Sequence, residues 1–169
     1  GLGHIGSRTA RVANAFDMNV IAWSQNLTAE RAAECDATLV DKDTLFRNSD
    51  IVSIHVVLSE RTRGLVGARE LSLMKREAYL VNISRGPIVD EAALISLLRR
   101  RAIAGAALDT FDVEPLPPGH PILSLPNTIL APHNGYVIEE TYQAFYAGIV
   151  EDITAFASGN PGRVLNPEV

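Results

Sequence analysis

Six residues with functional side chains follow short apolar segments of this sequence. Each segment has the length and composition of a buried strand, and the carboxyl ends of parallel strands meet at one edge of a sheet, where ligands bind. The residues are Ser24, His55, Arg85, Asp109, Glu114 and His133. Any one of them could be an ordinary solvated loop residue. Together they would bring a cation, imidazole and two carboxylates to one binding edge.

A glycine motif at the start of the sequence indicates which ligand this edge would bind. Gly1, Gly3 and Gly6 have the spacing G-x-G-x-x-G. In a dinucleotide-binding unit these glycines allow a tight turn, close approach of a pyrophosphate and close packing of the next helix. That helix would direct its free N–H groups and its positive dipole end at the phosphates. Alone the motif is weak, but beside the polar strand ends it suits hydride transfer coupled to proton transfer.

Apolar segments alternate with helical periodicities along the chain, as in a parallel sheet with helices on both faces. We predict strands at residues 19–23, 51–56, 79–82, 104–108 and 128–131. We predict helices from the glycine motif to Phe16 and at residues 29–34, 43–46, 70–74, 90–100 and 139–157, with Asp43 capping the third. Residues 115–126 are rich in proline and are expected to form an ordered loop. The fold class is therefore α/β, a Rossmann-like, doubly wound parallel sheet.

Composition argues against several other classes of protein. The 169 residues carry a net charge of −5 that is spread along the chain, so we expect no nucleic-acid partner. No apolar run approaches the roughly 20 residues of a membrane span, so we expect no membrane contact. Cys35 is the only cysteine, which fits a reducing, cytoplasmic setting. No pair of histidines has the spacing of metal ligands, so we expect no metal.

Four stretches of the sequence resemble the nicotinamide-binding domain of the D-isomer-specific 2-hydroxyacid dehydrogenase family. They are residues 1–6, 82–91, 108–115 and 131–136, and their order and spacing span nearly the whole chain. The resemblance implies an NAD(P)-dependent oxidoreductase whose substrate is a small 2-keto or D-2-hydroxy acid. We also expect a homodimer in the cytoplasm. Which 2-hydroxy acid is used stays open, since side-chain specificity in this family lies largely in another domain.

The resemblance assigns catalytic roles to three residues. Arg85 would bind the substrate carboxylate and carbonyl, for which a planar guanidinium offers a two-pronged donor. His133 would be the acid–base group, giving a proton to the carbonyl oxygen in reduction and removing the hydroxyl proton in oxidation. Glu114 would orient the His133 ring and favour its imidazolium form.

The resemblance also places the cofactor. Ser24 stands where NAD-preferring relatives carry a carboxylate for the ribose hydroxyls. Its loss removes repulsion against a 2′-phosphate, yet no arginine is next to Ser24 in the sequence. Both NAD and NADP therefore stay open, with a lean toward NAD. The expected cofactor-binding residues are Gly1, Gly3, His4, Ile5, Gly6, Ser24, Ile83, Ser84, Arg85, Asp109, His133 and Gly135.

In this family a separate substrate domain precedes the glycine turn. We therefore expect the chain to be a fragment that lacks this domain and the first strand of the sheet. Residues 1–136 would form the NAD(P)-binding domain, and residues 137–169 a helix and tail that return to the substrate domain.

Two alternative functions stay open at this point. One is a non-catalytic, NAD-sensing interaction protein, because some relatives of this family act as corepressors. The other is a related dehydrogenase for an amino or formate substrate. The pairing of His133 with Glu114 argues against formate, which has no hydroxyl proton to remove.

Overall fold

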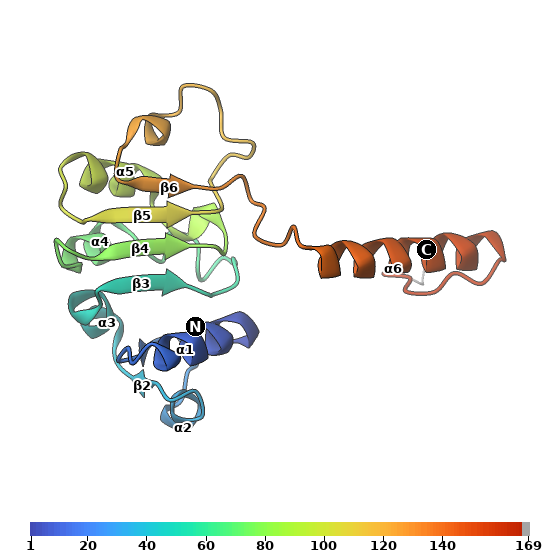
Figure 1. Ribbon diagram of the computed structural model, residues 1–169, viewed down its shortest axis with the longest axis horizontal. Coiled ribbons are helices and arrows are strands. Elements are labelled where there is room, and N and C mark those ends of the chain that lie inside the picture. Colours follow the sequence, from blue (N-terminus) through green and yellow to red (C-terminus); the bar gives the residue numbers. More distant parts are fainter. Residues whose placement is uncertain (167–169) are drawn as a thin grey trace. The chain divides into compact units, whose positions relative to one another are not determined.

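The structure is a computed structural model that describes residues 1–166 (Figure 1). It divides into two units, Gly1–His133 and Asn134–Val169. The strands of the first unit are β1 (Ile21–Ala22), β2 (Thr38–Leu39), β3 (Ile51–Ile54), β4 (Tyr79–Asn82), β5 (Gly105–Leu108) and β6 (Thr128–Leu130). Its helices are α1 (His4–Ala15), α2 (Ala29–Ala33), α3 (Lys42–Asn48), α4 (Ala68–Leu73) and α5 (Glu91–Arg99), with 3-10 helices at Gly86–Ile88 and Pro121–Ser124.

All of these strands pair in parallel, which confirms the predicted fold class. Strands β3, β4, β5 and β6 form one sheet in chain order (Figure 1). In its register Ile54 pairs with Asn82, Asn82 with Leu108 and Leu108 with Leu130. The carboxyl ends of the four strands therefore meet at one edge, and His55, Arg85, Asp109 and His133 follow these strands. Ser24 instead follows β1.

The region around β1 and β2 differs from the prediction. These two strands form a separate two-stranded sheet, and β2 was not predicted because its two residues are too few to show a periodicity. The predicted strand at residues 19–23 is shortened to Ile21–Ala22. Asp41 rather than Asp43 caps α3, with its carboxylate accepting a 2.9 Å hydrogen bond from the Thr44 N–H.

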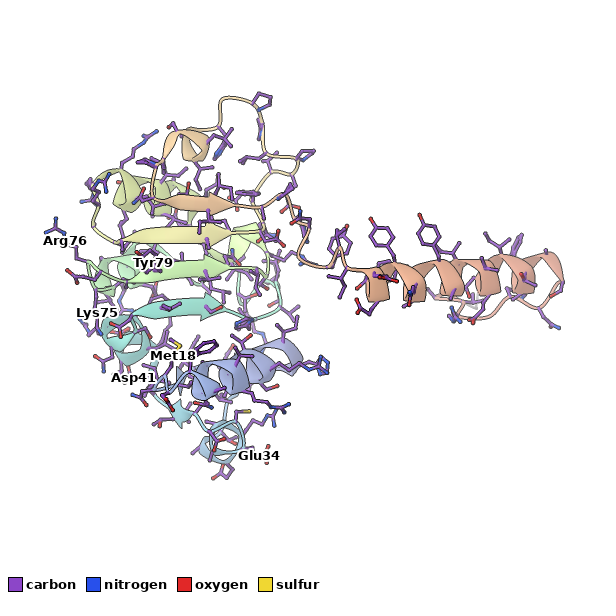
Figure 2. The ribbon with its side chains drawn as sticks, viewed as in Figure 1. Met18, Glu34, Asp41, Lys75, Arg76 and Tyr79 are labelled. Atoms are coloured by element: carbon purple, nitrogen blue, oxygen red, sulfur yellow. The ribbon has the colours of Figure 1, made fainter. Side chains whose placement is uncertain are left out.

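A large apolar core lies between the four-stranded sheet and the helices α3, α4 and α5. Strand residues such as Leu80 and Leu108 meet helix residues such as Leu71 and Leu94 in this core. Alternate residues point to the opposite face of the sheet, where Tyr79 is half exposed (Figure 2). A smaller apolar cluster joins α1, β1 and α2, and its buried members are Leu2, Ala10, Ala22 and Ala32.

The second unit contains the helix α6 (Glu139–Ala157), which confirms the helix predicted at these residues. None of its residues is buried in the structure. An apolar stripe of this helix is exposed at Tyr142, Phe145, Ile149, Ile153 and Phe156. Among the described residues, no helix has both the length and the apolar character needed to cross a membrane.

Candidate active site

The glycine turn is closely packed at two of its three glycines. A Cβ atom on Gly6 would lie 2.0 Å from the Gly1 carbonyl oxygen, and one on Gly1 would lie 2.9 Å from the His55 carbonyl oxygen. In front of Gly3 a Cβ atom would meet no atom within 4 Å. A side chain at Gly1 or Gly6 would therefore clash with neighbouring backbone, while the backbone at Gly3 is open to a ligand.

The beginning of α1 is suited to an anion. Its N-cap residue, Gly3, supplies no side-chain hydrogen bond, and its first turn contains no acidic residue. The N–H groups of this turn and the positive end of the helix dipole therefore face the open side of Gly3. A dinucleotide pyrophosphate fits this arrangement.

Ser24 lies beside the glycine turn. The Gly1 nitrogen donates a 3.0 Å hydrogen bond to the carbonyl of Trp23, the residue before Ser24. The Ser24 carbonyl in turn accepts a 3.1 Å hydrogen bond from the Leu27 N–H, which bends the chain toward α2. The hydroxyl predicted to face the adenosine ribose thus follows a strand that is hydrogen-bonded to the turn.

The turn that carries Arg85 is fixed by Asn82, a residue that the sequence reasoning missed. Asn82 is 1% exposed, and its side chain donates to the Arg85 carbonyl at 2.9 Å and accepts from the Ser84 N–H at 3.0 Å. The Ser84 hydroxyl donates to the Val56 carbonyl, linking the ends of β3 and β4. The available signal was a polar residue at a core-facing strand position, two residues before the Ser-Arg-Gly stretch that begins at Ser84.

Gly86 brings the Arg85 turn against the segment that follows β5. A Cβ atom on Gly86 would lie 2.0 Å from the Phe111 carbonyl carbon, so only glycine fits there. The Phe111 N–H donates a 2.8 Å hydrogen bond to Oε1 of Glu114. One packing contact and one hydrogen bond therefore connect the turn of Arg85 with the carboxylate of Glu114.

Glu114 and His133 form a hydrogen-bonded pair. Oε2 of Glu114 lies 2.7 Å from Nδ1 of His133, and each side chain is about one-third exposed. The backbone of His133 is in the left-handed region, with φ of 54°. Burial raises the pKa of the Glu114 carboxyl, but hydrogen bonds from His133 and Phe111 and the charges of His133 and Arg85 outweigh it, so the pKa lies below its ordinary value. Glu114 is thus ionised at neutral pH.

The remaining predicted residues are placed as follows. Asp109 comes directly after β5, and its N–H donates a 3.0 Å hydrogen bond to the Asn82 carbonyl. Nε2 of His55 lies 2.9 Å from the Ser53 hydroxyl, and burial lowers the pKa of this imidazole. Gly135 belongs to the second unit. Among the described residues, no group of three or more His, Cys, Asp or Glu side chains could hold a metal ion.

Comparison with known proteins gives a family match. Residues 1–135 match the family described as D-isomer specific 2-hydroxyacid dehydrogenase, NAD binding domain. The glyoxylate reductase of Aeropyrum pernix is 44% identical over 170 residues, covering 100% of this chain and 51% of that protein. The chain thus spans about half the length of this relative.

Two solved structures extend this match to the fold. A phosphoglycerate oxidoreductase from Vibrio cholerae is 35% identical with a TM-score of 0.88, over 94% of this chain and 51% of that one. An acyclic imino acid reductase in complex with NADPH and D-Arg is 32% identical with a TM-score of 0.78, over 98% of this chain and 52% of that one. Proteins of this fold therefore include one solved with NADPH.

Proposed function

The chain belongs to the D-isomer-specific 2-hydroxyacid dehydrogenase family, and we propose that its protein reduces a 2-keto acid to a D-2-hydroxy acid with NADH or NADPH. The observation that carries this proposal is the hydrogen bond between Glu114 and His133, next to the turn of Arg85. This pair and Arg85 together bring an acid–base group, an ionised partner and a carboxylate-binding cation to the carboxyl edge of the sheet. The reverse oxidation uses the same groups.

Each of these side chains has a defined task in the proposed reaction. A bound nicotinamide cofactor supplies a hydride to the carbonyl carbon, and negative charge develops on the carbonyl oxygen. Arg85 binds the substrate carboxylate with its two-pronged guanidinium and polarises the carbonyl. We assign proton donation to Nε2 of His133, because Nδ1 is bonded to Glu114. The Glu114 carboxylate fixes the orientation of the ring through its hydrogen bond with Nδ1.

For the cofactor we propose a path along the edge described above. The pyrophosphate would lie at Gly3 and the first turn of α1, with the adenosine ribose at Ser24. The nicotinamide half would lie along Ile83, Ser84 and Asp109. Glycine spacing, an uncapped helix start and the hydrogen bond between Gly1 and Trp23 support this path.

The test is an assay of the intact protein with a panel of 2-keto acids, including glyoxylate and hydroxypyruvate, with NADH and with NADPH. A 2-imino acid belongs in the panel because of the similarity to an imino acid reductase. We expect reduction of at least one 2-keto acid. Cofactor binding with no reduction of any of them would instead favour an NAD-sensing protein without catalysis.

Replacing Arg85 with Lys tests the carboxylate anchor within the same assay. Lysine keeps the charge but loses the two-pronged geometry, so KM for the keto acid should rise about 10- to 100-fold, the worth of one charged hydrogen bond. Arg99→Lys, on the exposed last turn of α5, is the matched control and should leave KM unchanged. An unchanged KM in Arg85→Lys would mean that another group holds the carboxylate.

A further inference from the structure

Arg31 reaches the glycine turn from α2, although 29 residues separate it from the contact it makes there. Its Nη2 donates a 3.4 Å hydrogen bond to the carbonyl of Leu2, between the first two glycines. Its backbone N–H is held by the hydroxyl of Thr28, the residue that caps α2, at 3.2 Å. The guanidinium is thus brought to the turn by a capped helix.

Ser24 approaches the same turn by another route. Gly1 is hydrogen-bonded to Trp23, so the end of β1 lies on the turn next to the residue that Arg31 contacts. Where a carboxylate at the end of β1 would repel a phosphate, Ser24 presents a neutral hydroxyl. The surroundings of the glycine turn thus combine a cation with a position that carries no negative charge.

The ion pair that Arg31 makes in the structure can be exchanged. Nη1 of Arg31 lies 2.8 Å from Oε2 of Glu34, and the two side chains are 48% and 64% exposed. Figure 2 shows Glu34, the residue that caps the C-terminal end of α2. Because solvent screens an exposed pair of this kind, a doubly charged phosphate can compete with Glu34 for the guanidinium.

We propose, on the basis of the function proposed above, that Arg31 is a cofactor-specificity residue that receives the 2′-phosphate of NADPH at the glycine turn. A guanidinium binds phosphate oxygens in a two-pronged geometry, and the 2′-phosphate is the group that distinguishes NADPH from NADH. Glu34 is the competing anion. The site therefore accepts NADPH as well as NADH, and the pair of Arg31 and Glu34 sets the ratio of the two affinities.

The experiment measures dissociation constants for NADH and NADPH on the intact protein by titrating the fluorescence of the reduced nicotinamide. Arg31→Gln should weaken NADPH binding at least tenfold and change NADH binding less than twofold. Glu34→Gln should tighten NADPH binding by about two- to fivefold, because it removes the competing carboxylate. Arg99→Gln, which makes the same charge change on α5, should alter neither constant.

Each outcome separates this inference from the one it rests on. Normal NADH binding in Arg31→Gln shows that the variant is folded, so an unchanged NADPH constant there overturns the role of Arg31 alone. Equal weakening of both cofactors also overturns it, because the contact would then serve a part that they share. If the unmodified protein binds neither cofactor, the proposed function fails and this inference fails with it.

Discussion

The two apolar clusters of the first unit support different parts of the candidate site. Below the strands that lead to Arg85 and Glu114 lies a core of large side chains, with Leu80 and Ile88 fully buried. Below the glycine turn and Ser24 lies a small cluster of one leucine and three alanines. The groups proposed for chemistry are thus held by packing, whereas the proposed adenosine end is held by hydrogen bonds from Gly1 to Trp23 and from Arg31 to Leu2. We expect catalysis to be sensitive to the large core and cofactor choice to be adjustable without loss of the fold.

The largest expected effect is on catalysis, from His133→Gln. This variant removes the proposed acid–base group, which follows β6 of the four-stranded sheet, and leaves the glycine turn intact. Turnover should fall by about two to four powers of ten, the usual worth of a positioned acid–base group, while the dissociation constant for NADH stays within about twofold. Steady-state kinetics and cofactor titration on the same preparation measure the two quantities. Near-normal turnover would remove His133 from the mechanism.

The second prediction compares the stability of the two clusters. Leu80 is fully buried in β4, and Leu80→Ala should lower the free energy of unfolding by about 2–5 kcal/mol. Leu39 only borders the small cluster, and Leu39→Ala should cost less than about 1.5 kcal/mol. Urea denaturation of both variants of the intact protein measures the difference. Equal losses would show that the small cluster is as tightly packed as the large one.

The sequence predicted the parts of this comparison that depend on local signals. The spacing of Gly1, Gly3 and Gly6 and the long periodicity of α6 are such signals, and the glycine turn and helix lie where they were predicted. The strand β2 was not predicted because its two residues are too few to show an alternation of apolar and polar side chains. Asp41 and Asp43 are both aspartates and could each cap a helix, and only the extended backbone of Asp41 identifies it as the cap of α3.

The contacts that complete the site could not be predicted from local sequence signals. Arg31 meets Leu2, and Gly86 meets Phe111, because strands and helices distant in sequence pack side by side. No arginine is next to Ser24 in the sequence, and Arg31 reaches the glycine turn only through the fold. The guanidinium of Arg31 reaches the turn because α2 packs against it, and this packing cannot be read from neighbouring residues in the sequence.

The third prediction concerns the link between the two regions. Nζ of Lys42 lies 2.9 Å from Oε1 of Glu70, on α4 of the large core, and 5.7 Å from the ring centre of Trp23, next to Ser24. Glu70 also accepts a 3.0 Å hydrogen bond from the Gly67 N–H at the start of α4. Burial raises the pKa of Glu70, but the hydrogen bonds and the charge of Lys42 outweigh it, so the pKa lies below its ordinary value of 4.5.

Because that pKa is lowered in the folded protein, the ionised form of Glu70 stabilises the fold above about pH 4.5, and this contribution is lost as the pH falls through the lowered pKa. Glu70→Gln should therefore lower the free energy of unfolding by about 1.5–3 kcal/mol at pH 7 and reduce its decline in acid. Thermal unfolding between pH 3 and pH 7 measures both effects. If the stability of Glu70→Gln falls in acid as steeply as that of the unmodified protein, other carboxylates cause the fall.

The smallest effect, and the sharpest test of the adenosine end, comes from Ser24→Asp. A carboxylate at this position would accept hydrogen bonds from the ribose hydroxyls, each worth about 1.5–3 kcal/mol, and would repel a 2′-phosphate. The preference should therefore move toward NADH by at least about tenfold, or roughly 1.4 kcal/mol, without a change in turnover at saturating NADH. Ser24→Asn, which keeps the position neutral, is the control. Since Arg31 would still face the turn, NADPH should bind weakly to Ser24→Asp and weaker still when Arg31→Gln is added. A ratio that stays unchanged in Ser24→Asp would mean that Ser24 does not face the ribose, and the adenosine end would then have to be sought elsewhere along the turn.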